Sequence, residues 1–435
     1  MKVAFATLGC RVNQYETEAM TEKFIKEGFE LTQFEEPADV YVINTCTVTN
    51  MGDKKSRQMI GRARRKNSSA VIAVVGCYSQ VDPQDVSNIK GVDIVLGTRN
   101  KGDIVYYITR FLQERKQIIE VKDVLSNNIF EDLKIEEYQD RTRAFLKIQD
   151  GCNRFCSYCL IPFARGAVCS KEPKMIFDEV KKLVKHGFKE IILTGIHIAS
   201  YGYDLKEECD LTYILQVIDK MEGVSRIRIG SIDPQFFKED TVQKLSLLTK
   251  LCPQFHLSLQ SGCDETLKRM NRRYTASEYK KIVEDLRENI PDVSITTDII
   301  VGFPGESQEE FNETYDFLKD IKLSRTHIFK YSPRKGTRAA LMQDAVDGNI
   351  KEKRSGIISE LDSENEKEFM SRFIGRKMKV LYEQSHKIDE NTYEGFTPNY
   401  IKVISKSMEN ISGKIVNTQI EKVLEKSLSG KILTF

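Results

Sequence analysis

Apolar and polar positions follow two periods along the chain, and the first 115 residues combine both. Short runs rich in β-branched residues alternate with amphipathic stretches of helical period. The apolar runs are residues 3–10, 40–46, 71–77 and 92–96, and the helical stretches between them are residues 16–28 and 54–65. This β-α-β-α-β order predicts an α/β domain with a doubly wound parallel sheet and helices on both faces.

Strand-like and helical runs also alternate between residues 140 and 372. The strand-like runs are residues 144–148, 190–194, 226–229, 255–259, 295–301 and 326–331, separated by helical runs such as 176–186, 211–221 and 278–288. Six βα units predict a partial (β/α)6 barrel, about three-quarters closed, with its functional site at the carboxyl ends of the strands. The heavily charged residues 349–373 predict a long helix that leads to the last domain.

The period changes to two near the C-terminus. Met378, Val380 and Tyr382 alternate with charged residues, and residues 415–423 are again strand-rich. Short strands between turn glycines predict a small antiparallel β-barrel over residues 373–435. Residues 116–139 show no sustained period and predict a linker. The predicted domains are therefore residues 1–115, 140–372 and 373–435.

The composition agrees with a chain of several domains and bears on the cellular compartment of the protein. The chain has 435 residues, 40% of them hydrophobic, which allows about three domains of ~150 residues with full cores. No run of 18 apolar residues and no secretory signal is present, so we expect neither a membrane span nor export. Ten cysteines without a short-range disulfide framework favour reduced thiols. We therefore expect a cytoplasmic protein, and we expect it to be a monomer.

Three cysteines follow the first strand of the predicted barrel within eight residues: Cys152, Cys156 and Cys159. A structural zinc site is closed by four ligands, whereas an iron–sulfur cluster held by three cysteines leaves one iron open to another molecule. A gap of three residues is also unusual for paired zinc ligands. The spacing favours an iron–sulfur cluster, and a zinc loop is the alternative.

Three further cysteines stand at the ends of three successive strands of the first domain: Cys10, Cys46 and Cys77. Parallel strands joined by helices bring their carboxyl ends to one edge of the sheet. We therefore expect these thiols to converge and to hold a second cluster with an open iron. The alternative is that each is a small buried core residue.

The spacing of Cys152, Cys156 and Cys159 resembles the cluster motif of the radical S-adenosylmethionine (SAM) enzymes. That resemblance implies that SAM chelates the open iron and that its reductive cleavage yields a 5'-deoxyadenosyl radical. Residues 7–18 and 44–49, followed by residues 53–58, are similar to the N-terminal domain of the methylthiotransferases. The sequence of residues 11–18 resembles that of the branch that acts on N6-threonylcarbamoyladenosine (t6A) in tRNA.

The resemblance implies a reaction. The enzyme would replace the C2 hydrogen of t6A, at position 37 beside the anticodon, with a methylthio group. One SAM would methylate a sulfide at the cluster of the first domain, and a second would be cleaved at the Cys152, Cys156, Cys159 cluster. The alternatives are the isopentenyladenosine branch, the ribosomal-protein branch, and a non-enzymatic zinc-dependent RNA-binding protein. The C-terminal barrel resembles the RNA-binding TRAM module.

Residues at strand ends of the barrel match positions that contact SAM in this family. The resemblance assigns cofactor contacts to Tyr158, Thr194, Gly195, Ser231, Gln260, Gly302, Pro304 and Gly305. Thr194-Gly195 departs from the Gly-Gly-Glu form of many members, so that contact is expected through backbone carbonyls. Arg165, after the cluster loop, is expected to help position cofactor or substrate. No catalytic side chain is assigned.

The charge balance does not by itself indicate a nucleic-acid partner, because 66 basic residues face 64 acidic ones. Local basic patches favour a nucleic-acid partner. Lys55, Arg62 and Lys66 share one helical face, and Arg273 lies in a second basic stretch. A solvated charged helix is the alternative for both. The expected partners are the tRNA anticodon stem-loop, SAM, and an electron donor such as flavodoxin or ferredoxin.

Overall fold

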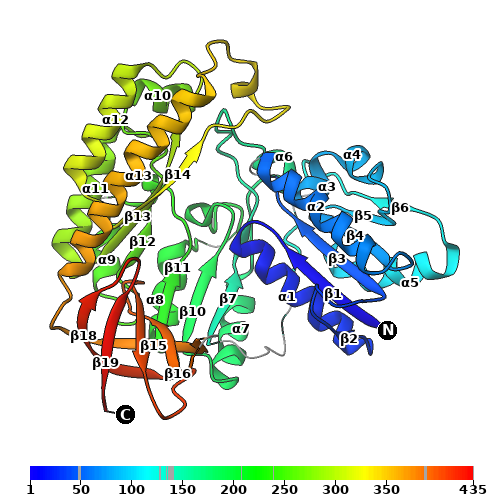
Figure 1. Cartoon of the computed structure of the whole chain (residues 1–435), viewed down its shortest axis with the longest axis horizontal. Helices are drawn as coiled ribbons and strands as arrows, with labels where there is room; N and C mark the ends of the chain where they lie inside the picture. Colours follow the sequence, from blue (N-terminus) through cyan, green and yellow to red (C-terminus); the bar gives the residue numbers. More distant parts are fainter. Residues whose placement is uncertain are drawn as a thin grey trace.

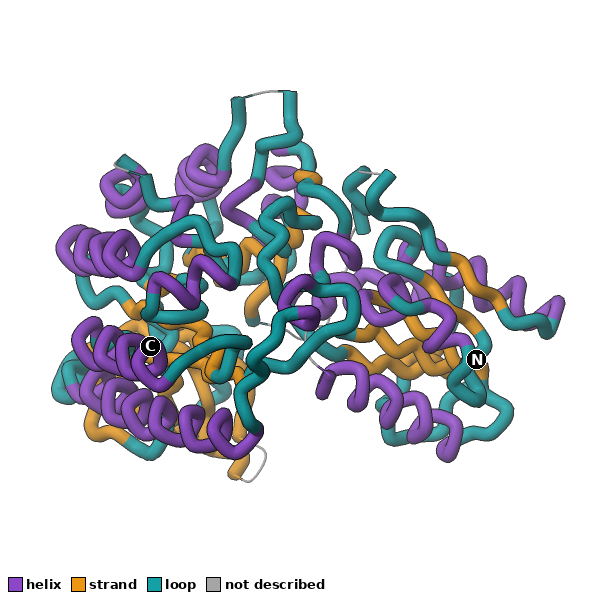
Figure 2. The backbone as a smooth tube through the Cα atoms, turned by 90° about the horizontal axis from the view of Figure 1, so that it is seen from above, coloured by secondary structure: helices purple, strands orange, loops and turns teal. Residues whose placement is uncertain are grey.

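The computed structural model describes residues 1–47, 50–126, 129–133, 135, 142–206, 208–238, 240–386 and 389–434. Part of the predicted linker, residues 127–128, 134 and 136–139, lies outside these ranges, as do residues 48–49 of the motif around Cys46. The described chain forms a sheet domain, an open barrel and a small closed barrel (Figure 1). Seen from above, the sheet domain lies beside the two barrels (Figure 2).

The first domain is a six-stranded parallel sheet in the order β2-β1-β3-β4-β5-β6. Its strands are β1 (Lys2–Thr7), β2 (Glu30–Leu31), β3 (Val40–Thr45), β4 (Val71–Gly76), β5 (Ile94–Leu96) and β6 (Ile118–Glu120). The predicted doubly wound sheet is confirmed. It includes two short strands that the sequence did not indicate, and one of them, β6, falls inside the stretch predicted as a linker.

Helices cover both faces of this sheet because successive strand residues point to opposite sides. Helices α1 (Arg11–Lys26) and α5 (Ile104–Glu114) pack on the face that carries Val40 and Val42. Helix α2 (Asn50–Lys66) packs on the other face with α3 (Cys77–Val81) and α4 (Pro83–Ser87). The chain leaves β1 toward β2 on one side and reaches β3 on the other, so the switch of strand order falls between β1 and β3. Ligands bind at such a switch point in open α/β sheets.

The central domain contains the six predicted strands in two parallel sheets, β7-β10-β11 and β12-β13-β14. Their bounds are β7 (Arg143–Lys147), β10 (Glu190–Thr194), β11 (Arg226–Ile229), β12 (Gln254–His256), β13 (Ser294–Val301) and β14 (Arg325–Lys330). Single bridges from Ile227 to Leu251 and from Ile232 to Leu257 join the two sheets. Among the described residues β7 and β14 do not pair, so the barrel stays open as predicted.

Helices surround this barrel and bury one continuous core against it. They include α7 (Pro173–Lys185), α8 (Leu211–Lys220), α9 (Thr241–Ser246), α11 (Ala276–Asn289) and α12 (Gln308–Ile321). Capping boxes fix the starts of α11 and α12, because Thr275 and Ser307 each exchange hydrogen bonds with a glutamate three residues on. The predicted charged helix is α13 (Gly348–Ser371), which packs along β14.

The C-terminal domain is a closed barrel in the order β15-β16-β17-β19-β18. Its strands are β15 (Lys377–His386), β16 (Asp389–Phe396), β17 (Lys402–Lys406), β18 (Ile415–Val423) and β19 (Leu428–Thr434). The predicted small barrel is confirmed, with one difference: β17 and β19 pair in parallel, whereas the other neighbours are antiparallel. Arg226 fastens it to the central domain by donating to the carbonyls of Phe396 (3.0 Å) and Lys379 (2.7 Å).

Helix length and polarity bear on the expected absence of a membrane span. No helix in the described part of the chain combines the length and apolar character needed to cross a bilayer.

Candidate functional site

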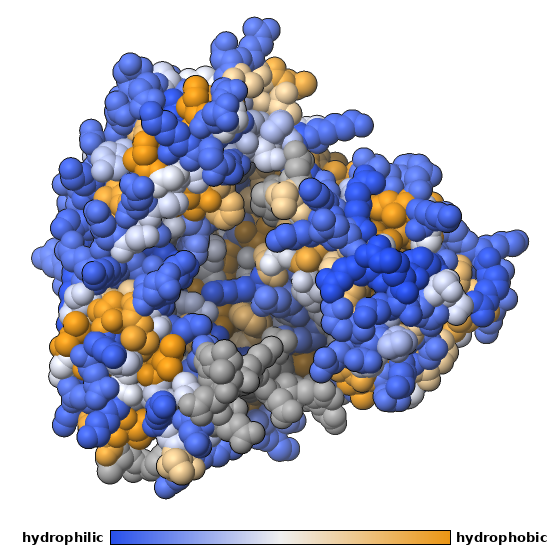
Figure 3. Space-filling model, in the orientation of Figure 1, coloured by the Kyte–Doolittle hydropathy of each residue, from blue (hydrophilic) through white to orange (hydrophobic). Residues whose placement is uncertain are grey.

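A cavity of about 850 Å³ lies where the three domains meet. Its walls come from the start of α1, from the loop between β8 (Gln149–Asp150) and α6 (Ile161–Arg165), from the barrel strands, and from the C-terminal barrel. The surface is hollowed between the sheet domain and the barrels (Figure 3). Segments more than 300 residues apart in sequence, such as Arg11 and Tyr400, therefore face the same space.

The loop after β8 brings Cys152, Cys156 and Cys159 to the wall of this cavity. Gly151 starts the loop with a φ of +72°, and a Cβ there would lie 1.8 Å from the carbonyl oxygen of Ala167. Only glycine meets both conditions. The Cys152 amide donates to the Gly166 carbonyl (3.0 Å) and the Cys159 amide to the Cys156 carbonyl (3.0 Å), so backbone hydrogen bonds fix the loop at both ends of the motif.

The electrostatics of this loop keep two of the thiols protonated until a metal displaces their protons. Burial, together with the charge of the nearby Cys156 thiol, raises the pKa of Cys152 to about 11 and that of Cys159 to about 12. Without a metal these thiols stay protonated. Arg272 donates to the Cys156 sulfur (3.2 Å) and thus brings positive charge to the triad. No local pattern links this arginine to Cys156, because 116 residues separate the two in sequence.

A second group of thiols lies at the carboxyl edge of the sheet. Cys10 precedes α1, Cys46 follows β3, and Cys77 begins α3. The closeness of the first two is visible at Gly9, where a Cβ would lie 2.6 Å from the Cβ of Cys46 and 2.7 Å from its sulfur. Cys10 is exposed and lines the cavity, whereas Cys46 and Cys77 are buried.

The two triads fit an iron–sulfur cluster by the chemistry of their donors. Each triad offers three thiols, which bind iron in such clusters. Cys10 of the sheet domain shares the cavity with all three cysteines of the loop after β8. Within the described residues no set of three histidine, cysteine or carboxylate side chains is already arranged as a metal site.

A buried ion network lies behind Cys77 and joins the sheet domain to the barrel. Arg165 donates to the Cys77 sulfur (3.3 Å) and also binds Glu16. Lys147 (2.8 Å) and Lys101 bind the same carboxylate, and all four charged side chains are fully buried. Burial alone would raise the pKa of Glu16, but Arg165 and the two lysines hold it well below its usual range.

The residues expected to contact SAM fall into two groups. Those that line the cavity are Tyr158, Thr194, Gly195, Ser231 and Gln260. Gly302, Pro304 and Gly305 lie outside its described lining: the Gly302 amide binds Glu306 (3.0 Å), and a Cβ at Gly302 would meet Lys351 at 2.3 Å. Their turn still supports the cavity, because Phe303 packs edge-on against Tyr158 at a centroid distance of 6.4 Å.

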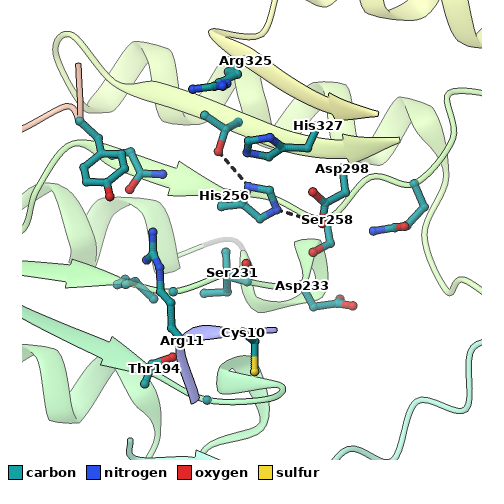
Figure 4. Close-up of a pocket in the computed structure, with 18 of the residues that line it drawn as sticks. Cys10, Arg11, Thr194, Ser231, Asp233, His256, Ser258, Asp298, Arg325 and His327 are labelled. Atoms are coloured by element: carbon teal, nitrogen blue, oxygen red, sulfur yellow. Dashed lines mark hydrogen bonds and ion pairs between the residues drawn. The ribbon is translucent and has the colours of Figure 1, made fainter. Parts of the chain in front are cut away.

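The barrel interior carries a polar cluster that the sequence analysis did not single out. His256 on β12 contacts Thr296 (2.9 Å) through Nδ1 and Asp298 (3.2 Å) through Nε2 (Figure 4). The His327 ring lies 5.7 Å from the His256 ring, and burial followed by the charge of His256 lowers the pKa of His327. These side chains come from alternating positions on adjacent strands, a signal that could have marked them as lumen residues.

The four basic residues expected at RNA lie away from the cavity. Lys55, Arg62, Lys66 and Arg273 are exposed and absent from its described lining. Arg62 is already paired with Glu35 (2.5 Å). The outer face of the sheet domain is strongly hydrophilic (Figure 3).

This architecture, an open parallel barrel whose first strand leads into a loop with three cysteines, defines a radical SAM enzyme. Two families match the chain: the Radical SAM superfamily over residues 146–318 and a family described as "Uncharacterized protein family UPF0004" over residues 2–97. Among solved structures, the fold is similar to that of the radical SAM methyltransferase TsrM from Kitasatospora setae. The TM-score is 0.58 at 15% identity, over 78% of this chain and 76% of that one.

Two curated relatives narrow the class. The chain is 44% identical to the threonylcarbamoyladenosine tRNA methylthiotransferase MtaB of Bacillus subtilis, over 97% of this chain and 94% of that one. It is 36% identical to the tRNA-2-methylthio-N(6)-dimethylallyladenosine synthase of Clostridium tetani, over 98% and 95%. The chain belongs to the radical SAM methylthiotransferase family, in its threonylcarbamoyladenosine tRNA methylthiotransferase branch. It is a tRNA methylthiotransferase that uses SAM and a 4Fe–4S cluster.

Proposed function

We propose that this enzyme converts t6A at position 37 of tRNA to its 2-methylthio derivative, with two SAM molecules and two 4Fe–4S clusters. The observation that carries the proposal is the cavity that Cys10 shares with Cys152, Cys156 and Cys159. The 44% identity to a relative named for t6A supports the substrate. The sequence of residues 11–18 resembles that of the t6A branch and supports the same substrate.

The six cysteines divide between two clusters in this proposal. Cys152, Cys156 and Cys159 hold the cluster that binds SAM, and Cys10, Cys46 and Cys77 hold the auxiliary one. When bound, the clusters supply the electron that cleaves SAM and the sulfur that is transferred, chemistry that side-chain acids and bases cannot perform at an aryl carbon. Arg272 and Arg165 stabilise the thiolate forms, because each donates to one sulfur of a triad.

The remaining cavity residues bind and orient. Tyr158, Thr194, Gly195, Ser231 and Gln260 surround the SAM that is cleaved, and the turn of Gly302, Pro304 and Gly305 supports Tyr158 from behind through Phe303. The target adenine must leave its stack to enter the cavity. The C-terminal barrel closes one side of the cavity and would grip the anticodon stem-loop next to the extruded base.

The proposal also includes contacts of the outer surface with tRNA and with an electron donor. The exposed basic residues Lys55, Arg62, Lys66 and Arg273 would contact the phosphate backbone farther along the tRNA. A small redox protein such as flavodoxin or ferredoxin would deliver electrons. The functional division of the chain follows residues 1–115, 140–372 and 373–435.

Mass spectrometry of tRNA nucleosides tests the substrate. In a strain that lacks this protein we expect 2-methylthio-t6A to disappear and t6A to accumulate, with both reversed by the wild-type gene. Loss of the 2-methylthio derivative of isopentenyladenosine instead would assign the enzyme to the substrate class of the Clostridium tetani relative. An unchanged nucleoside profile, with a ribosomal protein losing its modification, would favour the third branch.

A further inference from the structure

The residue directly after Cys10 has an unusual position. Arg11 and Cys10 both line the cavity, and their side chains extend to different parts of it (Figure 4). Consecutive Cα atoms lie about 3.8 Å apart, so the two side chains leave the backbone at adjacent points of the cavity wall. A charged group that faces a cavity and lacks a counterion is costly unless a ligand pairs with it.

The carboxylates near Arg11 are already occupied by other arginines. Glu190 accepts from Arg228 (2.7 Å) and lies 3.6 Å from Arg226, and Glu383 pairs with Arg143. Within the described part of the chain, the Arg11 side chain makes no hydrogen bond and no ion pair. Four guanidinium groups thus share two carboxylates, which leaves this corner of the cavity positively charged.

Aromatic rings hold the arginines in this corner. Phe396 and Tyr400 stack with centroids 4.8 Å apart, and the guanidiniums of Arg143 and Arg228 lie 5.3 Å and 4.5 Å from the Tyr400 centroid. Arg11 lies 6.0 Å from the same ring. Cation–π contacts satisfy the flat faces of a guanidinium and leave the N–H edge free for an in-plane acceptor.

The conformation of Tyr400 indicates that this wall is preformed. Its φ is +67°, a left-handed conformation that a bulky aromatic residue rarely adopts. The Thr397 hydroxyl fixes the turn, because it accepts from the Ile401 amide (2.9 Å) and Tyr400 donates its own amide to the Thr397 carbonyl (3.0 Å). Strain of this kind persists where the surrounding structure uses it, often at a ligand site.

We infer that Arg11 binds the carboxylate of the threonylcarbamoyl group and thereby selects t6A over adenosines with uncharged N6 substituents. The inference rests on the proposed function and deepens it. The threonylcarbamoyl group carries a planar carboxylate, which an arginine fork binds with two parallel hydrogen bonds. A dimethylallyl group is apolar and gives this corner nothing to pair with. Arg11 is therefore a specificity residue for the reaction beside Cys10.

A comparison of single variants on two RNA ligands tests the inference by binding rather than by turnover. Two synthetic anticodon stem-loops are needed: one with t6A, and one in which a hydroxymethyl group replaces the threonyl carboxylate. With the reconstituted wild-type holoenzyme we expect the t6A stem-loop to bind about tenfold tighter or more, since hydrogen bonds to charged groups have this strength. Arg11→Gln should bring the ratio of the two dissociation constants close to one, and Arg11→Lys should restore part of it.

Lys402→Gln is the matched control, because this cavity lysine already pairs with Glu394 (3.2 Å). It should leave the ratio of the two affinities unchanged. Equal iron content in the Arg11 variants would show that the nearby cysteines still bind metal. If Arg11→Gln weakens both stem-loops equally, the residue contacts phosphate and the inference is wrong. If wild-type enzyme methylthiolates t6A and Arg11→Gln keeps its full discrimination, the inference fails while the proposed function stands. If wild-type enzyme does not modify t6A, the proposed function itself fails.

Discussion

Glu16 joins the first domain to the second through buried ion pairs. Its carboxylate pairs with Lys101 from its own domain and with Lys147 and Arg165 from the barrel, and no solvent reaches any of the four. A buried ion network contributes to stability only while every charge has its partner. Arg165 also reaches Cys77, so the same network positions one of the thiols.

Glu16→Gln should therefore destabilise the protein by about 3–5 kcal/mol, because three buried cations lose their shared counterion. Thermal unfolding of the purified variant measures the loss. The wild-type stabilisation is present above pH ~4.5, the unfolded-state pKa, and is lost as pH falls, because the folded-state pKa of Glu16 is depressed.

Glu114→Gln is the control for that variant. It removes one partner of the exposed Arg110–Glu114 pair (3.0 Å) and should change stability by less than about 1 kcal/mol. Equal effects of the two substitutions would contradict the role assigned to the buried network.

At this scale the sequence predicted the cysteines and missed their partners. Cysteine spacing is local, so all six candidate ligands could be proposed before the fold was known. The arginines that donate to their sulfurs are 88 and 116 residues away from them in sequence. Only the closure of the domains brings such pairs together, and no periodic pattern records it.

Helix α13 carries a carboxylate whose titration acts on the seam between helix and barrel. Asp362 accepts a hydrogen bond from the Thr326 amide of β14. Burial, together with the charge of Glu366, raises the pKa of Asp362 to about 6. The folded state therefore keeps a proton that the unfolded state loses between pH ~4 and ~6, so stability falls as pH rises through this window.

Asp362→Asn keeps the acceptor and removes the charge. We expect it to have little effect near pH 4 and to stabilise the protein by about 1–2 kcal/mol at pH 8, an estimate reduced for partial solvent exposure. Unfolding temperatures across pH 4 to 8 measure the difference. Glu364→Gln, on the exposed face of α13, should not alter the pH dependence; the same response from both variants would refute the assignment.

Helix α2 presents its basic residues to solvent, and its contact with tRNA is testable through salt. If Lys55 and Lys66 each neutralise a phosphate, Lys55→Gln and Lys66→Gln should each lower the slope of log affinity against log salt by about 0.7–0.9. Arg62→Gln should change the slope less, because Glu35 already neutralises Arg62. An unchanged slope in both lysine variants would make α2 a solvated face only. Titrations of the anticodon stem-loop at several salt concentrations provide the data.

Strands could be predicted where the hydrophobic pattern extends over enough residues to show a period. Strand-like runs of four to seven residues gave clear signals, and all six barrel strands occur near their expected positions, although β12 is shorter than its predicted run. Strand β2 has two residues and β6 has three, too few to show a period. The parallel pairing of β17 with β19 depends on how the barrel closes, which a period of two does not specify.

The whole molecule places one cavity at the junction of three domains, and this arrangement depends on docking contacts. Arg226 reaches the C-terminal barrel, Arg334 reaches Asp53 of α2 (2.7 Å), and Glu16 reaches the central barrel. The sequence predicted each domain from its own pattern and predicted two groups of three cysteines. It could not predict which of the expected SAM contacts would line the cavity, because lining depends on how α13 covers the turn at Gly302.

The central claim is that two sulfur triads, one in each of the first two domains, each bind a cluster beside the shared cavity. The most direct test is the iron content per chain after anaerobic reconstitution of the wild-type protein and of the triple variant C10A/C46A/C77A. The account predicts about eight irons in the wild type and about four in the variant, as two and one 4Fe–4S clusters require. About four irons in both proteins would contradict it.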